Sequence, residues 1–195
     1  MNYLSGFSKL FLILLIVYLL SAFFAKSNFK VERTRVVQAS QKLVYNQIGI
    51  LKNWENWSIW QEKDHSIQYT FEGKDAENGA VMHWKGDPEK SGTGLIEIIQ
   101  ADPPYSMVYK LKGKLPFSIQ SMGSFILSAE NSKRTTVLWT DHGQIPFLLR
   151  PVLMFIDVEA IMAPDMERGF FKIDSICSSF QNQIQLIMHQ DSLKI

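Results

Sequence analysis

The chain has 195 residues, with 20 Lys and Arg against 19 Asp and Glu, and 46% of its residues are hydrophobic. This length fits one ordinary domain, and the hydrophobic content excludes a mostly disordered chain. The formal net charge of +1 argues against nucleic acid as a partner, which requires a basic surface, and the single cysteine excludes an internal disulfide.

The first predicted element is an uncharged run of 16 residues between Lys9 and Lys26, with the sequence LFLILLIVYLLSAFFA. As a helix this run reaches about 24 Å, and the apolar residues before Lys9 extend it towards the ~30 Å of a hydrocarbon core. A signal peptide is the competing interpretation, although the segment has no A-x-A cleavage site. We predict that residues 1–27 form a single-pass membrane anchor, which contacts the membrane through residues 10–25.

The charge distribution bears on the side of the membrane that the domain occupies. Residues 26–52 carry six basic groups and one acidic group, a net charge of +5, whereas residues 53–195 carry a net charge of −5. A basic stretch beside a membrane segment favours the cytoplasmic side. The alternative is that these charges are the solvent face of a first strand, and long domains also translocate regardless of charge.

Residues 28–190 are predicted to form a single domain that is rich in strands. Residues 29–37 read as an extended segment, and Ser40 then caps a short helix over 41–50. Six further strands are predicted, and apolar and polar side chains alternate along them, at 67–71, 80–85, 94–100, 107–112, 117–127 and 134–142. Because side chains alternate between the two faces of a strand, this pattern indicates an antiparallel sheet of about seven strands with one covered face.

A long helix is predicted to supply that cover. From Pro164 onward, apolar residues recur at steps of three and four, at Met166, Phe170, Ile173, Cys177, Phe180, Ile184 and Ile187. These steps place them on one stripe of a helix of more than 20 residues, which must be buried against the sheet. A coiled-coil seam is the competing interpretation. The predicted fold class is α+β, a curved sheet around a C-terminal helix.

Several motifs accompany this order of elements. Val31-Glu32-Arg33, followed by the NWENWSIW run that ends at Trp60, resembles the "V-x-R … W-x-x-W-S-P-W" opening of the START-like or SRPBCC helix-grip superfamily, which includes polyketide cyclase/dehydrase and lipid-transport domains. The other matching positions follow in the same order: Tyr69 with Gly73, Gly79 with Trp84 and Gly86, Gly92-Thr93-Gly94, Pro116-Phe117, Thr135 to Trp139, and Glu167-Arg168-Gly169. The resemblance implies a cavity between sheet and helix that binds hydrophobic small molecules or lipids, without implying cyclase chemistry.

Two groups of aromatic and sulfur-containing residues are the candidate ligand-binding residues. Trp54, Trp57 and Trp60 combine flat apolar surfaces with N–H donors, which suits the mouth of a cavity. Their alternative role is to plug the sheet beside the short helix. The second group shares the inner face of the sheet and suits a mostly apolar pocket or a filled core: Met82, Trp84, Met107, Tyr109, Phe125 and Trp139.

Two charged residues are the candidate polar contacts of a ligand. Asp141 has the strand parity of Trp139, and Arg33 has the parity of Val31. Since the resemblance suggests that the first and last strands are neighbours, we expect Arg33 and Asp141 to pair inside the cavity and to orient the polar end of a ligand. The alternative is that a strand end or bulge turns both side chains to solvent.

No catalytic signature is present, and no cofactor or metal is predicted, because the chain lacks a nucleophile elbow, a phosphate-binding loop, a dinucleotide fingerprint and a metal-ligand spacing. The leading hypothesis is a membrane-anchored domain that binds a hydrophobic or lipid-like small molecule without transforming it. One alternative is a polyketide cyclase/dehydrase-like enzyme that uses Asp141 or Tyr109 as an acid or base. A second is a partner-binding module, which contacts an unidentified protein through an exposed apolar patch near 151–164, with its apolar residues at 151–156.

Overall fold

The computed structural model of the protein describes residues 2–114 and 118–192. The helical elements, in chain order, are α1 (Asn2–Phe24), α2 (Gln41–Gly49), η1 (Leu51–Asn53), α3 (Trp54–Trp57), α4 (Ile59–Lys63), η2 (Phe147–Leu149), α5 (Arg150–Leu153) and α6 (Val158–Ser192). The strands are β1 (Asn28–Val37), β2 (Gln68–Glu72), β3 (Val81–Lys85), β4 (Thr93–Asp102), β5 (Ser106–Lys114), β6 (Ser118–Asn131) and β7 (Arg134–Gln144). All seven predicted strands are present, although the first residue of the predicted strand 117–127 lies outside the described residues.

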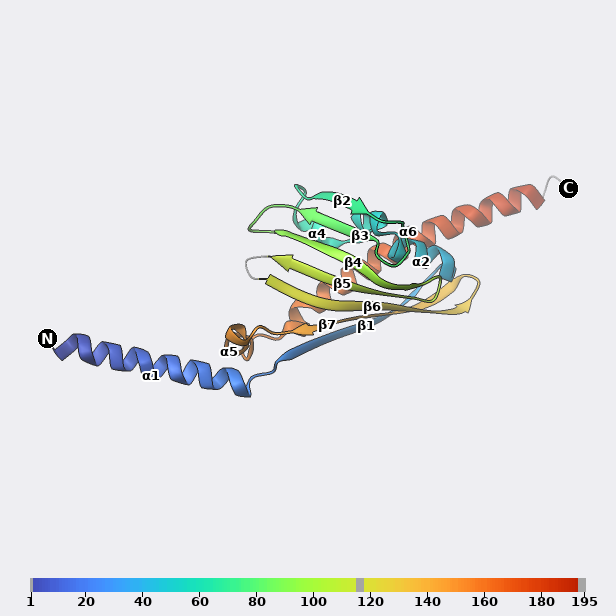
Figure 1. Ribbon diagram of the computed structural model, residues 1–195. Coiled ribbons are helices and arrows are strands. Elements are labelled where there is room, and N and C mark those ends of the chain that lie inside the picture. Colours follow the sequence, from blue (N-terminus) through green and yellow to red (C-terminus); the bar gives the residue numbers. More distant parts are fainter. Residues whose placement is uncertain (1, 115–117, 193–195) are drawn as a thin grey trace.

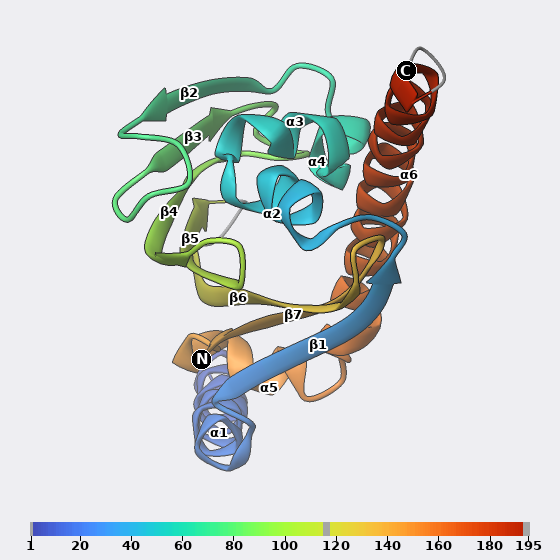
Figure 2. The same cartoon turned by 90° about the vertical axis from the view of Figure 1, so that its right-hand side faces the viewer.

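The strands form one antiparallel sheet in the order β1-β7-β6-β5-β4-β3-β2. Strands β2 to β6 each pair with the next strand along the chain, whereas β1 pairs with β7, from Asn28 opposite Gln144 to Val37 opposite Thr135. The sheet curves, and α2, α3, α4 and α6 lie on its inner side (Figure 2). This arrangement confirms the predicted α+β fold with a helix held by a curved sheet.

The inner face of the sheet carries the hydrophobic core. Five of the residues that the alternation assigns to this face are buried. Met82, Trp84, Met107, Tyr109 and Phe125 are all at most 4% exposed. The short helix α2 packs Val44 and Ile48 into the same core, and α6 adds Phe170 and Ile173. The core therefore joins elements from both ends of the domain.

Helix α6 differs from the predicted helix at both ends. It begins at Val158 rather than at Pro164, because the side chain of Asp157 accepts the backbone N–H of Glu159 at 2.9 Å and caps the first turn. Its apolar stripe is buried from Met166 to Cys177. The last three members of the predicted stripe are not buried, because α6 runs past the edge of the sheet (Figure 1). They are Phe180, Ile184 and Ile187, which are 46%, 41% and 59% exposed.

Helix α1 extends away from the domain (Figure 1), and one stretch of it, Gly6–Phe24, is long and apolar enough to cross a membrane. Its C-terminal turns contact the segment that follows β7. The hydroxyl of Tyr18 donates a hydrogen bond to the carbonyl of Leu148, and the ring of Phe23 packs edge-on against Phe147 with centroids 5.2 Å apart. These contacts fix the position of η2 and α5 relative to α1.

Candidate functional site

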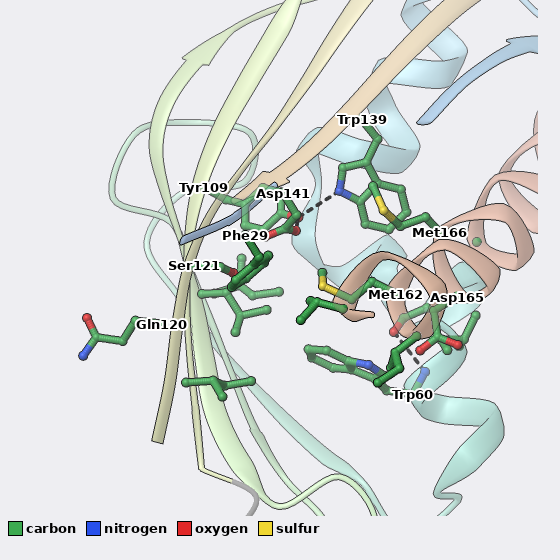
Figure 3. Close-up of a pocket in the computed structure, with 18 of the residues that line it drawn as sticks. Phe29, Trp60, Tyr109, Gln120, Ser121, Trp139, Asp141, Met162, Asp165 and Met166 are labelled. Carbon is green, nitrogen blue, oxygen red and sulfur yellow. Dashed lines mark hydrogen bonds between the residues drawn. The ribbon is translucent and has the colours of Figure 1, made fainter. Parts of the chain in front are cut away.

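A cavity of about 400 Å³ lies between α6 and the inner face of the sheet (Figure 3). Its walls come from four parts of the chain: the sheet strands, the α3–α4 segment, the η2–α5 segment and the first turns of α6. Most of the lining residues are apolar, and the volume falls within the range of small-molecule binding sites, roughly 300–1,000 Å³. The fold therefore leaves room for a ligand rather than a filled core.

The structure brings seven of the eleven predicted site residues to the cavity wall. They are Trp54, Trp57, Trp60, Met82, Tyr109, Trp139 and Asp141. Met107 and Phe125 are 0% exposed in the core behind this wall, and Trp84 is 4% exposed beside Trp60, with ring centroids 5.0 Å apart. The inner face of the sheet therefore forms both the cavity wall and the packed core, which the sequence analysis gave as alternatives.

The inner end of the cavity rests on packed aromatic rings. The ring of Trp57 lies 4.6 Å from that of Trp54 and 5.8 Å from that of Trp139. Both α3 indoles are already hydrogen-bonded, because Trp54 Nε1 donates to the carbonyl of Ile48 at 2.7 Å and Trp57 Nε1 donates to the carbonyl of Gln47 at 2.8 Å. These two tryptophans therefore offer a ligand apolar surface and no free N–H donor.

A short chain of hydrogen bonds provides the polar end of the cavity. Trp139 Nε1 donates to the hydroxyl of Tyr109 at 3.0 Å, and that hydroxyl donates to Asp141 Oδ2 at 2.5 Å (Figure 3). Asp141 Oδ1 is buried and accepts no hydrogen bond of good geometry among the described residues, although the Ser121 hydroxyl lies close enough to lower the pKa of the carboxyl. Because buried polar atoms are normally satisfied, this oxygen is the acceptor most available to a ligand at this end.

Burial controls the ionisation of both groups. Burial raises the pKa of the Asp141 carboxyl, and the hydrogen bond from Tyr109 opposes that rise. Burial also raises the pKa of Tyr109 well above its usual value, and the neighbouring charge of Asp141 raises it further. The pair can therefore hold or accept a proton at the cavity wall.

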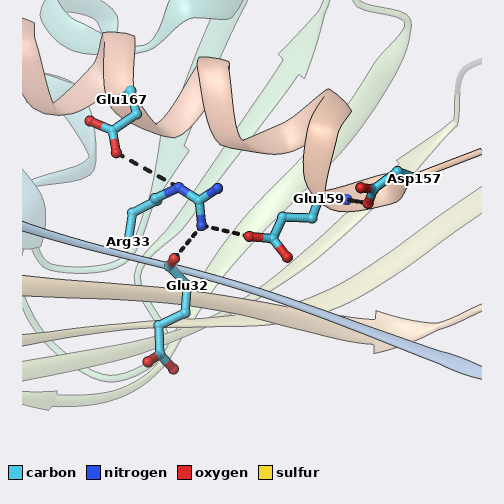
Figure 4. A network of polar contacts seen from close by, with 5 residues as sticks. All are labelled: Glu32, Arg33, Asp157, Glu159 and Glu167. Carbon is cyan, nitrogen blue, oxygen red and sulfur yellow. Dashed lines mark hydrogen bonds and ion pairs between the residues drawn. The ribbon is translucent and has the colours of Figure 1, made fainter.

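The predicted Arg33–Asp141 pair is wrong, although β1 and β7 are neighbours as expected. Arg33 Nη1 donates to the side chain of Glu159 at 2.9 Å, and its Nε lies 3.7 Å from a carboxylate oxygen of Glu167 (Figure 4). Both acidic residues belong to α6, which covers the position of Arg33 on β1. Arg33 therefore fastens α6 to the sheet and is not part of the cavity wall.

Several lining residues were not predicted from the sequence. Met162 and Met166 lie on α6, Ser121 lies on β6, and Leu149 and Leu153 come from the η2–α5 segment. Met166 is the first member of the predicted stripe, and Met162 precedes it by four residues on the same helix, so a stripe that began one turn earlier would have included it. The two leucines come from the apolar stretch after β7, whose segment 151–156 was interpreted as a surface for a protein partner.

The lining residues that are also exposed to solvent lie at two parts of the wall. Pro146 and Ile161 lie beside η2, α5 and the start of α6, and Ile119 and Gln120 lie on β6. A second carboxylate at the wall, Asp165, is already paired, because both of its oxygens accept hydrogen bonds from Lys63 Nζ at 2.8 and 2.9 Å. Within residues 2–114 and 118–192, no group of three or more His, Cys, Asp or Glu side chains could hold a metal ion.

Comparison with models of protein families and with curated protein sequences finds no match for this chain. Solved structures do match it. Norcoclaurine synthase from Thalictrum flavum, in complex with dopamine and hydroxybenzaldehyde, is 11% identical with a TM-score of 0.57, and the match covers 78% of this chain and 88% of that one.

The Aha1 dimer from Colwellia psychrerythraea is 12% identical with a TM-score of 0.54, over 77% of this chain and 96% of that one. An uncharacterised protein from Rhizobium leguminosarum is 11% identical with a TM-score of 0.58, over 78% and 95%. At these identities the likeness concerns the fold alone. This chain thus has the helix-grip fold of these proteins, with one additional apolar helix at its N-terminal end.

Proposed function

We propose that this chain is a membrane-anchored domain that binds a hydrophobic or lipid-like small molecule without transforming it. The observation that carries the proposal is the cavity of about 400 Å³ with mostly apolar walls and one polar end. Residues 1–27 act as the anchor and residues 28–190 as the ligand-binding domain. Tethering keeps the domain concentrated near a ligand that dissolves poorly in water.

The ligand-binding part of the proposal is supported by the composition of the walls. Trp57, Met82 and Met166 present apolar surface, whereas the hydrogen-bonded Tyr109 and Asp141 provide a polar end. A site of this kind holds an apolar body and orients it through a few polar contacts. The similar fold of norcoclaurine synthase, whose structure contains dopamine and hydroxybenzaldehyde, accommodates small molecules.

The anchoring part is supported by α1. Only 6% of an 18-residue window within Gly6–Phe24 is buried against the rest of the protein, so most of its apolar side chains have no protein cover. A bilayer would supply that cover, since 19 helical residues reach about 28 Å, close to the thickness of a hydrocarbon core. We place the domain on the cytoplasmic side, because residues 26–52 carry a net charge of +5.

Filling the cavity from Ser121 is the direct test. We expect Ser121→Phe to lower the amount of apolar ligand recovered with the protein by roughly tenfold or more, because the phenyl ring would occupy space that the ligand needs and a loss of about 1.4 kcal/mol in binding is a tenfold loss in affinity. The full chain would be purified in lipid nanodiscs, extracted with solvent and analysed by mass spectrometry, with empty nanodiscs as the background.

Ser128→Phe is the matched control, since Ser128 lies on the same strand with its side chain exposed on the opposite face. Equal ligand recovery from the two variants, each with an unchanged circular dichroism spectrum, would show that the ligand does not occupy the cavity.

A cyclase/dehydrase-like enzyme is the second candidate, favoured by the Tyr109–Asp141 hydrogen bond at the cavity wall. A carboxyl with a raised pKa beside a reacting group suits acid–base catalysis. On this hypothesis, the full chain converts the co-purified compound either to a cyclised isomer, detected by a change in chromatographic retention, or to a dehydrated product that has lost one water. Asp141→Asn slows that conversion by roughly 100-fold or more. Recovery of unchanged compound from the wild-type protein after long incubation would instead support binding alone.

A partner-binding module, the remaining alternative, is less favoured. Within the apolar segment 151–156, Pro151 is buried and Leu153 lines the cavity, so part of this segment already belongs to the domain. Its exposed members are considered next.

A further inference from the structure

Exposed apolar side chains lie beside the cavity wall on η2, on α5, on the loop between α5 and α6 and on the first turn of α6. We call them the apolar rim, and they are Leu148, Val152, Met154, Phe155, Ile156 and Ile161. They are between 39% and 90% exposed, with Phe155 the most exposed. Their chain neighbours Leu149 and Leu153 line the cavity, so the rim and the cavity wall are one continuous apolar surface. A surface of this kind typically marks an interaction site.

The contacts of α1 set the depth of this rim. Tyr18, which donates its hydroxyl hydrogen to Leu148, precedes Phe24 by six residues, or about 9 Å along the helix axis. Phe23 packs against Phe147 in the same place. If Gly6–Phe24 spans the hydrocarbon core, Phe24 marks the surface of that core. The contact with Tyr18 then holds η2 about 9 Å inside the surface, among the acyl chains of one leaflet. Figure 1 shows α5 beside α1 at this position.

The charges near the rim agree with such a position. The guanidinium of Arg150 lies 5.5 Å from the centre of the Phe147 ring and donates from Nε to the carbonyl of Ile145 at 3.1 Å, so this charge is partly satisfied within the protein. The acidic residues Asp157 and Glu159 come only after most of the rim. Glu159 is bound to Arg33 on β1, which fastens the start of α6 and thereby the rim to the sheet (Figure 4).

We propose that the apolar rim is embedded in the lipid leaflet that holds the C-terminal turns of α1, and that the cavity opens directly into the acyl chains of that leaflet. The ligand is then an amphiphile or apolar lipid that resides in the membrane and enters the cavity without crossing water. This inference rests on the proposed anchoring by α1. A bilayer is favoured over a protein partner because the contacts of Tyr18 and Phe23 bring the rim to bilayer depth without any partner.

The depth of the rim can be measured with a fluorescent label. The full chain carrying Phe155→Cys is labelled with the polarity-sensitive fluorophore NBD and reconstituted into protein-free phosphatidylcholine vesicles. The native Cys177 is 0% exposed, and burial raises the pKa of its thiol to about 12, so the label attaches at the new position. Ile126→Cys is the matched control, since Ile126 is an exposed apolar residue on β6, 49% accessible and outside the rim.

We expect phosphatidylcholine with a nitroxide at carbon 5 of an acyl chain to reduce the emission of the Phe155 label by roughly twofold or more, because interfacial segments lie about 5–10 Å into the headgroup and acyl boundary. The Ile126 label should keep its emission. Met154→Cys, labelled in the same way, provides a second rim position in case the first variant fails to fold.

Unquenched emission from both rim labels, in protein that resists extraction with alkaline carbonate, would overturn the inference and leave the anchor standing. Release of the protein by carbonate would instead overturn the anchor, and this inference with it.

Discussion

Trp57→Ala is expected to destabilise the domain by about 3–5 kcal/mol, the cost of truncating a buried tryptophan. Trp57 is 1% exposed, and its ring contacts Trp54, Phe125 and Trp139 at centroid distances of 4.6, 6.3 and 5.8 Å. Truncation also leaves the buried carbonyl of Gln47 without the N–H that it accepts. Urea unfolding of the full chain in detergent micelles, followed by circular dichroism, measures the change in the free energy of unfolding.

Trp60→Ala is the matched control on the neighbouring helix. Trp60 is only half-buried and packs on one ring, that of Trp84 at 5.0 Å. Its loss should cost about 1–2 kcal/mol, in proportion to the smaller area removed from water. Equal losses of unfolding free energy for the two variants would contradict the interpretation that Trp57 belongs to the core, whereas Trp60 lies at its edge.

Gly123→Ala should be the most damaging single-methyl insertion at the site. A Cβ atom at Gly123 would lie 2.0 Å from Cζ and 2.2 Å from the hydroxyl oxygen of Tyr109. The Tyr109 ring cannot easily yield, because it is 1% exposed and packs against Trp54 and Phe125 at centroid distances of 5.4 and 5.9 Å. We expect a loss of about 1–3 kcal/mol in the free energy of unfolding.

The same insertion should displace the Tyr109 hydroxyl from Asp141, which near-ultraviolet circular dichroism can detect as a change in the aromatic signal. Gly169→Ala is the control, since its Cβ would come no closer than 3.3 Å to a ring atom of Trp139. Alanine is also the better helix former, so this variant should keep its stability. A Gly123→Ala protein with wild-type stability and an unchanged spectrum would show that the Tyr109 ring moves freely.

The sheet could be predicted because the alternation of apolar and polar residues along each strand shows which of its faces is buried. The alternation of Met107, Tyr109 and Leu111 with Val108 and Lys110 assigns the inner face, and the buried residues of β5 follow it. Such a pattern depends only on neighbours along the chain, so the number of strands, their approximate bounds and the class of the fold could all be predicted from the sequence.

The cavity could be predicted less completely because its walls meet only in three dimensions. Strand parity places Arg33 on the inner side of β1, but it does not reveal that Glu159 and Glu167 of α6 lie above it and bind it in place of Asp141. Likewise, the helical stripe predicts burial of Phe180 and Ile184, although the sheet ends before it reaches them. A stripe shows which face of a helix is apolar, and the length of its partner decides how much of that face is covered.

The pairing of β1 with β7 has a consequence for synthesis of the protein. β1 is the first strand to be synthesised, and its pairing is complete only after Gln144, which lies opposite Asn28, has left the ribosome. The backbone of β1 therefore stays unpaired while more than a hundred residues are added. Unpaired edges invite aggregation, and charged side chains discourage it. β1 carries charges at Lys30, Glu32, Arg33 and Arg35, which protect the nascent chain until β7 closes the sheet.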